Sequence, residues 1–453
     1  MNKTPLTSGL LVIFGITGDL SRRYLLPALS DLAAQNLLPE QFEIIGTTRR
    51  RVTAADVLGQ VSSEAAAQLA GRLRIVQMDP TLEADYRALK STLDRIEDER
   101  GVCLNRLFYL SIPPGTYGPV VDLLGTSGLN TGCQHGEADS RVMIEKPFGY
   151  DLESARELIA RIKHSFKESQ IYRIDHYLAK ETAQNILVFR FTNPIFEAVW
   201  DSGSIQDITI TASETIGVEG RAAFYESTGA LRDFVQNHLL QLLAITTMEK
   251  PRVLDSDHIH REKLKLLRSI RKIKPNKVAE VSARGQYRGY AEEVGNPDST
   301  TETFARLKLR IGNERWNEVN LTLQTGKRLN KRSTEIVITF AAQQGSTPNT
   351  LRFRIQPDEG IDIDLQAKKP GLDNKTEQVE MAFTYAESFG LKTQPNAYER
   401  VLMDGIRGDQ TLFATSDEVI ASWEIVEAVV REWSKNGDGL TIYDPGTPAA
   451  NIN

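Results

Sequence analysis

The sequence of 453 residues has little cysteine and no long apolar run. Its two cysteines, Cys103 and Cys133, cannot build a disulfide framework, and so few cysteines fit a reducing cytosol. No stretch reaches the length of about 20 apolar residues that a membrane-spanning helix needs. The apolar run at 10–14 is too short for the core of a signal peptide. These absences predict a cytoplasmic protein.

The charge balance and the histidine spacing exclude two further classes. The net charge is −6 and no Lys/Arg block forms a tail, so a nucleic-acid partner is not expected. No Cys/His cluster has the spacing of zinc ligands, so no metal is expected. An anionic protein that binds anionic ligands must concentrate its positive charge locally. Local cationic segments are therefore more informative than the total charge.

The length favours two domains. In the first third, strand patterns alternate with helical patterns, which predicts a parallel sheet with right-handed crossovers. After about residue 200, strand patterns follow one another with few helical spacers, which predicts a mainly antiparallel sheet. We therefore expect an α/β protein with a Rossmann-like parallel-sheet domain at 1–178 and a larger α+β domain at 179–453. The strands expected in the first domain are 10–14, 42–46, 73–77, 106–111 and 141–145. Helical patterns include 53–69, 152–168 with Asp151 as the N-cap, 229–249 and 397–407.

A glycine-rich turn joins the first expected strand to the helix that follows it. Such a turn lets a pyrophosphate approach the backbone, and the helix N-terminus supplies free N–H groups and a positive dipole end. The spacing is Gly-x-x-Gly, and a tight turn also needs glycine for steric reasons alone. The candidate cofactor-binding residues here are Gly15, Thr17, Gly18, Asp19, Leu20 and Arg22.

Three residues near other strand ends are further candidates for the cofactor cleft. Arg49 follows the second strand, where a 2′-phosphate of NADP would need a cation, although a solvated basic turn is the alternative. Tyr117 lies either against the cofactor or in the core. Lys146 follows the fifth strand, at the edge of a parallel sheet where ligands bind.

The segment 173–181 carries a carboxylate, an imidazole, a phenol and an ammonium group within nine residues. Asp175 and His176 are consecutive, so on extended backbone their side chains face opposite ways. Asp175 therefore needs a partner elsewhere, and His238 is the obvious candidate. His238 is either a core histidine or a general base that a carboxylate orients.

Together these segments resemble the glucose-6-phosphate dehydrogenase family over nearly the whole chain. The motifs occur in the family's order: Gly-x-x-Gly-Asp-Leu, Glu-Lys-Pro-Phe-Gly at 145–149, Arg-Ile-Asp-His-Tyr-Leu-x-Lys-Glu at 173–181, Arg-Asp-x-x-Gln-Asn-His-Leu-Leu-Gln at 232–241, Thr-Gly-Lys-Arg-Leu at 325–329, and Tyr-Glu-Arg with Arg-Gly-Asp-Gln-Thr-Leu-Phe between 398 and 413. The resemblance implies oxidation of C1 of β-D-glucose 6-phosphate to 6-phosphoglucono-δ-lactone with NADP, the first step of the pentose phosphate pathway. It also implies a homodimer or homotetramer.

The resemblance implies a role for each matching residue. His238 would take the proton of the C1 hydroxyl, and Asp175 would stabilise the imidazolium that forms. His176, Tyr177 and Lys180 would bind the sugar phosphate, with Arg332 or Lys331. Hydroxyls of the sugar would bind Glu214 and Asp233. Lys327 would join the substrate site, Lys146 would lie between sugar and cofactor, and Arg49 would meet the adenosine 2′-phosphate.

Two alternatives and one departure remain at this point. The chain could be a dehydrogenase of another hexose or hexose phosphate, or a catalytically inactive NADP-binding sensor. Tyr24 stands where the family usually carries a lysine, so the cofactor end of the cleft differs in detail. The sequence does not decide the use of NAD beside NADP, the order of the oligomer or the presence of a second, structural cofactor.

Overall fold

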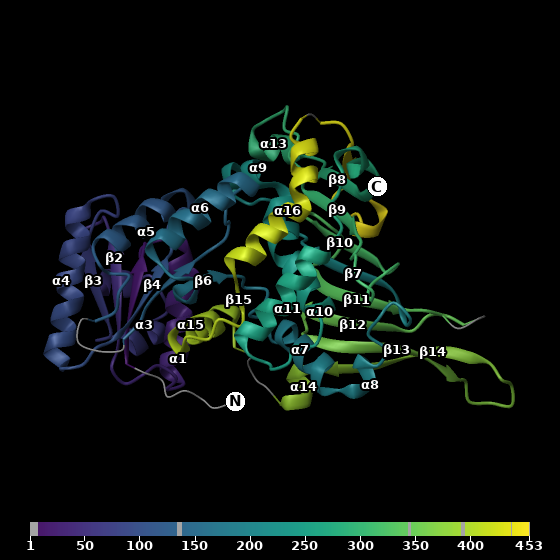
Figure 1. Cartoon of the computed structure of the whole chain (residues 1–453), viewed down its shortest axis with the longest axis horizontal. Helices are drawn as coiled ribbons and strands as arrows, with labels where there is room; N and C mark the ends of the chain where they lie inside the picture. The colour runs from purple at the N-terminus through teal and green to yellow at the C-terminus, as the bar shows by residue number, and fades with distance from the viewer. Residues whose placement is uncertain (1–7, 134–137, 343–345, 391–394, 436, 453) are drawn as a thin grey trace.

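The computed structural model describes residues 8–133, 138–342, 346–390, 395–435 and 437–452. These residues form two β-sheets that lie side by side, with helices between and around them (Figure 1). A continuous cluster of buried apolar side chains includes residues of both sheets, and a smaller cluster lies near the C-terminus. In the described part of the chain, no helix is long and apolar enough to cross a membrane.

The first sheet has seven strands in the order β15-β6-β5-β4-β1-β2-β3. All neighbours pair in parallel except β15 with β6, which confirms the expected Rossmann-like sheet. The central strands are fully buried because helices cover both faces, which explains their continuous apolar runs. The strands are β1 (Gly9–Phe14), β2 (Phe42–Thr48), β3 (Leu73–Gln77), β4 (Asn105–Leu110), β5 (Ser140–Ile144), β6 (Ile171–Ile174) and β15 (Phe413–Ala414).

The helices around this sheet match the expected patterns with local breaks. Asp151 caps α6 through a capping box with Ser154, as the sequence predicts. The expected single helix at 53–69 is divided at Gly59 into two short helices. The elements are η1 (Ser21–Leu25), α1 (Leu26–Ala34), α2 (Ala54–Leu58), α3 (Ser63–Leu69), α4 (Glu83–Arg100), η2 (Pro114–Thr116), α5 (Tyr117–Thr126), α6 (Leu152–Ser165) and η3 (Glu168–Gln170).

Residues from the C-terminal third of the chain return to the first sheet. β15 pairs with β6, and α15 (Ala397–Arg407) packs against α1. The long helix α16 (Ser416–Trp433) then runs from β15 toward the second sheet, in yellow in Figure 1. The indole of Trp423 on this helix donates a hydrogen bond of 3.0 Å to the carbonyl of Phe148. The two parts of the protein therefore share structure at the place where they meet.

The second sheet has nine strands in the order β14-β13-β12-β11-β7-β10-β9-β8-β16. It is mainly antiparallel, as expected; β7 with β10 and β8 with β16 are the parallel pairs among its described strands. The strands are β7 (Ile205–Ser213), β8 (Ser282–Tyr287), β9 (Phe304–Leu309), β10 (Asn320–Gly326), β11 (Ser333–Phe340), β12 (Thr350–Gln356), β13 (Gly360–Lys368), β14 (Thr376–Thr384) and β16 (Leu440–Tyr443).

The helices of the second part cover one face of this sheet and separate it from the first (Figure 1). The expected helix at 229–249 consists of three pieces, and its middle piece, η4, is a π-helix. The elements are α7 (Glu181–Thr192), α8 (Pro194–Glu197), α9 (Ala222–Ala230), η4 (Leu231–Leu239), α10 (Leu240–Thr247), α11 (Ser256–Ser269), η5 (Pro275–Lys277), α12 (Val278–Val281), α13 (Tyr290–Val294), α14 (Tyr385–Phe389) and η6 (Ala449–Asn451).

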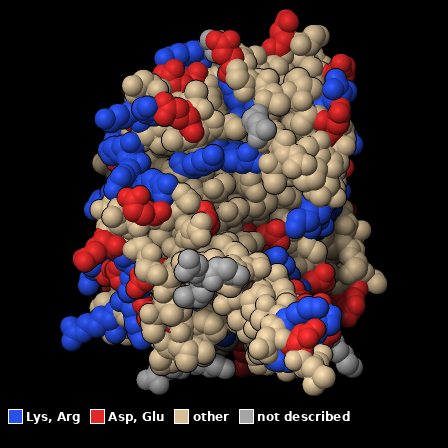
Figure 2. All heavy atoms as spheres, turned by 90° about the vertical axis from the view of Figure 1, so that its right-hand side faces the viewer, with Lys and Arg blue, Asp and Glu red and all other residues tan. Residues whose placement is uncertain are grey.

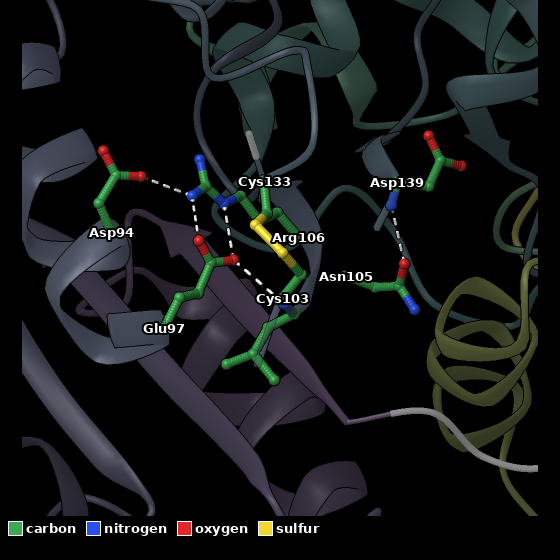
Figure 3. Close-up of a disulfide and its surroundings, with 8 residues drawn as sticks. Asp94, Glu97, Cys103, Asn105, Arg106, Cys133 and Asp139 are labelled. Atoms are coloured by element: carbon green, nitrogen blue, oxygen red, sulfur yellow. Dashed lines mark hydrogen bonds and ion pairs between the residues drawn. A yellow bond between two sulfur atoms is a disulfide. The ribbon is translucent and has the colours of Figure 1, made fainter. Parts of the chain in front are cut away.

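A disulfide joins Cys103 and Cys133 in the first part of the protein (Figure 3). It tethers the start of β4 to the segment that precedes β5. Beside it, Arg106 forms ion pairs of 2.6 Å with Asp94 and 2.5 Å with Glu97. A single disulfide is not a disulfide framework, in agreement with the sequence. A reducing cytosol would keep the two cysteines as free thiols, whereas the structure shows them bonded. The sequence reading missed this bond because spacing alone does not place two cysteines side by side.

Candidate active site

Asp175 and His238 form a buried pair where the two parts of the protein meet. Nδ1 of His238 lies 2.6 Å from Oδ1 of Asp175, and the residues are 1% and 4% exposed. The same carboxylate oxygen accepts a hydrogen bond of 2.9 Å from the backbone N–H of Tyr177. The expected partner of Asp175 is thus confirmed. The pair leaves Nε2 of His238 free to exchange a proton.

Burial and mutual charge set the protonation states of this pair. Burial lowers the pKa of His238, and the Asp175 carboxylate opposes that effect only in part. Burial alone would raise the pKa of Asp175, but His238, His176 and the Tyr177 N–H hold it at about 2. At neutral pH the pair is therefore a carboxylate beside a neutral imidazole. That is the state a general base requires.

The π-helix η4 brings a second carboxylate to the same face as His238. In a π-helix each residue lies one turn from the residue five positions ahead, so Asp233 and His238 are stacked. The start of η4 is fixed where Glu302 accepts a hydrogen bond of 3.0 Å from the N–H of Leu231. Gly229 lies against Glu302 with φ of 68°, and a Cβ there would come within 2.4 Å of the Glu302 carboxylate. Glycine is therefore required at this junction.

Lys146 joins the end of β5 to η4. Its Nζ donates hydrogen bonds of 2.7 Å to Oδ1 of Asp233 and 2.8 Å to the Asp233 carbonyl, and it lies 5.5 Å from the ring centroid of Phe234. Burial would raise the pKa of Asp233, but Lys146 and Lys327 keep it below its usual value. Lys146 thus lies at the sheet edge, as expected, and also neutralises a buried carboxylate.

A second ion pair comes from the larger sheet. Nζ of Lys327 lies 2.6 Å from the carboxylate of Glu214, and the ring of Tyr225 is 5.1 Å from that Nζ. Glu214 directly follows β7 and Lys327 directly follows β10, which pairs with β7 in parallel. The carboxyl ends of these strands therefore place a carboxylate and a cation together, 113 residues apart in sequence. Neither the pairing of Lys146 with Asp233 nor that of Lys327 with Glu214 was predicted from the sequence.

Aromatic rings surround the imidazole of His238. The ring centroids of Tyr177, His176 and Phe234 lie 4.5, 4.7 and 5.6 Å from it. Burial raises the pKa of Tyr177, and the amide of Gln356 donates to its hydroxyl at 3.2 Å. Burial is also the main cause of a pKa of His176 well below its usual value, so His176 is neutral.

The expected phosphate-binding cations differ in their exposure and in their distance from this cluster. Lys180 precedes α7 and is half-buried, and its charge lowers the pKa of His176 less than burial, His238 and Lys146 do. Arg332 is exposed just before β11 and forms no ion pair with another described residue. Lys331, its neighbour, pairs with Glu335 at 2.9 Å. The structure therefore brings Lys180 near the dyad and leaves Arg332 in solvent.

The glycine-rich turn lies between β1 and η1 at the carboxyl edge of the first sheet. Gly15 has φ of 81°, and a Cβ there would approach the Ser111 carbonyl to 2.3 Å. The N–H groups of Gly15 and Ile16 donate to the carbonyl of Thr47 at 3.1 and 3.2 Å. The turn is thus held against the ends of β2 and β4. The sequence predicted the position of this turn but not its contacts.

The side chains near this turn are mostly charged and exposed. Asp19 forms ion pairs of 2.9 Å with Arg22 and with Arg23. The Thr17 and Thr48 hydroxyls are 3.3 Å apart, which joins the turn to the end of β2. Leu20 is half-buried ahead of η1, and Arg49 is exposed one residue after β2.

Tyr117 and Tyr24 differ in exposure. Tyr117 begins α5 and is 1% exposed in the core, so the structure as it stands matches the core interpretation of this residue. Tyr24 is exposed, and its ring stacks on that of Tyr398 at 5.0 Å. A tyrosine pair therefore occupies the place where the family usually has a lysine.

Glu145 is a functional candidate that the sequence reading did not single out. It immediately precedes Lys146, and the hydroxyl of Tyr109 donates to it at 2.5 Å. Burial raises the pKa of Glu145 to about 7, although Tyr109 and Lys146 oppose the effect. Its position in the Glu-Lys-Pro-Phe-Gly motif was the available signal. Among the described residues, no group of His, Cys, Asp and Glu is arranged to hold a metal ion.

Comparison with known proteins gives the same family over both parts of the chain. Residues 12–185 match the family model described as glucose-6-phosphate dehydrogenase, NAD binding domain, and residues 187–451 match its C-terminal domain. A glucose-6-phosphate 1-dehydrogenase of Aggregatibacter actinomycetemcomitans is 40% identical over 96% of this chain and 93% of its own length. The Bacillus subtilis protein of that name is 39% identical, over 98% of this chain and 95% of its own.

Solved structures agree with this result. A glucose-6-phosphate dehydrogenase in complex with its substrate glucose-6-phosphate superimposes with a TM-score of 0.90 and 32% identity, covering 98% of this chain and 96% of the other. The glucose-6-phosphate 1-dehydrogenase of Mycobacterium avium gives a TM-score of 0.83 at 34% identity, covering 97% and 95%. An oxidoreductase from Sinorhizobium meliloti, at 11% identity and a TM-score of 0.53, shares the fold. The chain belongs to the glucose-6-phosphate dehydrogenase family.

Proposed function

We propose that this protein oxidises C1 of β-D-glucose 6-phosphate to 6-phosphoglucono-δ-lactone and transfers the hydride to NADP, as the first step of the pentose phosphate pathway. The observation that carries the proposal is the buried pair of Asp175 and His238, 2.6 Å apart. Its support is membership of a family whose relatives carry this activity in their names. The pair argues against the alternative of a catalytically inactive sensor, because a protein that only binds NADP needs no oriented base.

His238 would act as the general base on the C1 hydroxyl. Asp175 accepts the proton on Nδ1 in a hydrogen bond, which fixes the tautomer and leaves Nε2 as the acceptor. The pKa of His238 is lowered by burial, so the ring is neutral before the reaction. Removing the hydroxyl proton as hydride leaves C1 avoids positive charge on that carbon. A positioned base of this kind contributes about 10²–10⁴-fold to the rate.

Asp175 would stabilise the imidazolium that forms on His238. Its pKa of about 2 keeps it ionised throughout the physiological range. A full negative charge at 2.6 Å offsets the burial of the new positive charge. The proton then leaves through His238 when the lactone dissociates.

The sugar phosphate would bind His176, Tyr177, Lys180 and Arg332. A phosphate dianion needs several donors, and Lys180 and Arg332 supply the charge. His176 is neutral here, so it acts as a hydrogen-bond donor rather than as a cation. Because Arg332 is exposed, its side chain is free to move onto the phosphate.

The sugar hydroxyls would bind the two ion pairs. Asp233 and Glu214 offer carboxylate oxygens, and Lys146 and Lys327 hold them at 2.7 and 2.6 Å. Fixed polar groups of this kind discriminate strongly against a ligand that lacks the matching hydroxyl, since they would then stay unpaired. Lys146 also lies at the edge of the first sheet, between the sugar site and the cofactor turn.

The first sheet fits a nicotinamide dinucleotide. Gly15 lets the turn pack against the Ser111 carbonyl, which a Cβ would approach to 2.3 Å, and η1 with α1 begins directly behind the turn. The candidate residues for this cofactor are Gly15, Thr17, Gly18, Asp19, Leu20, Arg22, Arg49, Tyr117 and Lys146. When bound, the cofactor accepts the hydride from C1. We infer NADP rather than NAD because Arg49 provides a cation, not an acid, after β2.

The test is the rate of nicotinamide reduction, followed by absorbance, with glucose 6-phosphate and either NADP or NAD. Rapid reduction with NADP and little with NAD is expected. Equal rates would keep the reaction and reject the argument from Arg49. Unphosphorylated glucose should be a very poor substrate, since Lys180 and Arg332 would have no phosphate to bind. Comparable turnover of glucose would instead favour a dehydrogenase of another hexose.

We further propose a homodimer or homotetramer assembled through the larger sheet. Its edge strand β14 exposes Val379 and Met381, at 42% and 61%. Neutral residues cover much of the molecular face that Figure 2 shows, on the side of that sheet. An edge strand with exposed apolar side chains favours association. Light scattering behind a sizing column should give twice or four times the chain mass of 50.6 kDa.

We also propose a division at residues 178 and 179, with β15 as a strand that the second domain lends to the first sheet. A cytoplasmic location is proposed on the low cysteine content. The bond between Cys103 and Cys133 bears against that location. A thiol titration of the protein purified without oxidation decides it, since a cytoplasmic protein should yield two free thiols.

A further inference from the structure

A small cavity lies beside the dyad, and its lining includes Lys146, which pairs with Asp233. Its volume is about 20 Å³, about the space that one water molecule needs, and its lining includes Asp175, His238, Gln241 and Ser422. These residues come from four places in the fold: the end of β6, η4, α10 and α16. The cavity therefore lies where the first sheet meets the helices of the second part. Lys146 at its margin connects it to the site already described.

Besides Nε2 of His238, three polar atoms of the residues that line this cavity have no hydrogen-bond partner among the described residues. They are Oδ2 of Asp175, Oε1 of Gln241 and Oγ of Ser422. The residues that carry them are 4%, 3% and 2% exposed. Buried polar atoms are almost always paired, because an unpaired one loses its interaction with water and gains nothing. A small polar molecule in the cavity would supply the missing hydrogen bonds.

The ability of these three atoms to donate or accept hydrogen bonds indicates which molecule fits the cavity. The carboxylate and amide oxygens can only accept hydrogen bonds, so they cannot pair with each other, whereas the hydroxyl both donates and accepts. A water molecule donates two hydrogen bonds and accepts others, which matches two acceptors and a hydroxyl. An anion would be repelled by Asp175. We propose that ordered water in this cavity links Oδ2 of Asp175 to Gln241 and Ser422.

Gln241 and Ser422 are then positioning residues for the base. Oδ1 of Asp175 is already fixed by His238 and by the N–H of Tyr177. Water on Oδ2 fixes the other side of the carboxylate, so the plane of the carboxylate and the tautomer of His238 are both determined. This inference rests on the proposed role of His238 as the base. Neither Gln241 nor Ser422 needs to touch sugar or cofactor.

The direction of the effect on His238 follows from charge. The other charged and titratable groups that interact with the dyad are Asp233 on η4, Glu145 and Lys146 after β5, and His176 and Tyr177 beside Asp175. None of them changes when Gln241 or Ser422 is replaced. Losing a hydrogen bond at Oδ2 leaves the carboxylate less solvated, which favours the protonated imidazole beside it. The pKa of His238 should therefore rise.

The test uses Gln241→Met and Ser422→Ala in the full-length protein. The kcat with glucose 6-phosphate should fall about fivefold, as for one lost hydrogen bond. The acid limb of kcat/KM should move up by about half a pH unit, while KM for the sugar phosphate stays within about twofold. NMR titration of the His238 imidazole, which needs no turnover, should show the same shift. Ser422→Thr keeps the hydroxyl and should restore the wild-type profile.

The matched control is Thr247→Val on α10. Thr247 is fully buried, and its hydroxyl donates to the Leu243 carbonyl at 2.7 Å rather than lining the cavity. Thr247→Val should change neither the pH of the acid limb of kcat/KM nor the midpoint of the NMR titration of His238. A titration of His238 that is unchanged in both Gln241→Met and Ser422→Ala would overturn the inference, whatever their stability.

A crystal structure supplies the second, independent decision. Electron density for water within hydrogen-bond distance of Oδ2 of Asp175 and of Gln241 or Ser422 supports the inference. A dry cavity, or direct contact between these side chains, overturns it. If the wild-type protein does not reduce NADP with glucose 6-phosphate, the proposed function fails. The NMR titration and the density still decide the cavity in that case.

Discussion

The dyad and the glycine-rich turn are built on different physical principles. In the dyad, His238 and Asp175 are almost fully buried and paired at 2.6 Å, and burial or charge displaces both pKa values. In the turn, Gly15 shapes the backbone, and arginines such as Arg49 extend into solvent. The dyad fixes its side chains before substrate arrives, while the turn fixes only its backbone.

This difference predicts where mutations act. A buried charge that loses its partner has no solvent to compensate, so a change at the dyad should be large and should reach kcat. An exposed cation is screened by water and salt, so a change there should be smaller and should reach KM of the cofactor. Mutations in the glycine-rich turn should have an intermediate effect, because the backbone of the turn is packed while the side chains around it are largely exposed.

Asp175→Asn should have the largest effect. The amide cannot stabilise the imidazolium, and it can turn its NH₂ toward Nδ1 and impose the wrong tautomer. We expect kcat to fall by about 10²–10⁴-fold with KM for glucose 6-phosphate little changed, as steady-state kinetics would show. Asp404→Asn is the control, since Asp404 is buried at 2% but pairs with Arg400 elsewhere. Similar losses in both variants would show that the effect is only structural.

Gly15→Ala should have the next largest effect. The new Cβ would meet the Ser111 carbonyl at 2.3 Å, on backbone with φ of 81°. The free energy of unfolding should fall by about 2–3 kcal/mol, and KM for NADP should rise more than tenfold. Denaturant melts and kinetics measure the two quantities. Gly115→Ala is the control, because no atom lies within 4 Å of a Cβ there. A wild-type KM in Gly15→Ala would contradict a turn that approaches the cofactor.

Arg49→Gln should have a smaller and more selective effect. The loss of an exposed cation should raise KM for NADP about tenfold and leave KM for NAD unchanged. The quantity to measure is therefore the ratio of KM for NADP to KM for NAD. Arg87→Gln, on the exposed face of α4 beside Glu83, should change neither. Equal changes for NADP and NAD would mean that Arg49 does not meet the 2′-phosphate.

The pH dependence should be the mildest effect over the physiological range. The base works when neutral, so kcat/KM should be at its plateau above the pKa of His238 and fall as pH drops through it. Because burial lowers that pKa, the midpoint should lie below the ordinary value of 6.5. A midpoint near 7 would contradict this assignment and point to Glu145, whose pKa burial raises to about 7.

The fold was largely predictable where one element carries its own pattern. β1 to β5, α6 with its Asp151 cap and α15 at 397–407 all lie where the sequence places them. β6 and β15 were missed because they have four and two residues, too few for a periodic pattern. The return of β15 to the first sheet depends on tertiary packing, which local patterns do not contain.

The site was predictable to the same degree. The alternation of Asp175 and His176 required a distant partner, and the structure supplies His238. The ion pair of Lys327 with Glu214 was not predictable, since it arises only when β7 and β10 pair in parallel. Ser422 gave no signal at all: it is an ordinary serine within a helix until α16 packs beside the dyad. The disulfide was missed for the same reason of long-range geometry.

The most direct test of the central claim is His238→Asn with glucose 6-phosphate. Turnover and binding of the sugar phosphate should be measured on the same folded protein, by nicotinamide absorbance and by calorimetry. Turnover should fall by at least about 10²-fold, while the dissociation constant should change by less than about threefold. Turnover within a few-fold of the wild-type protein would contradict the assignment of His238 as the base.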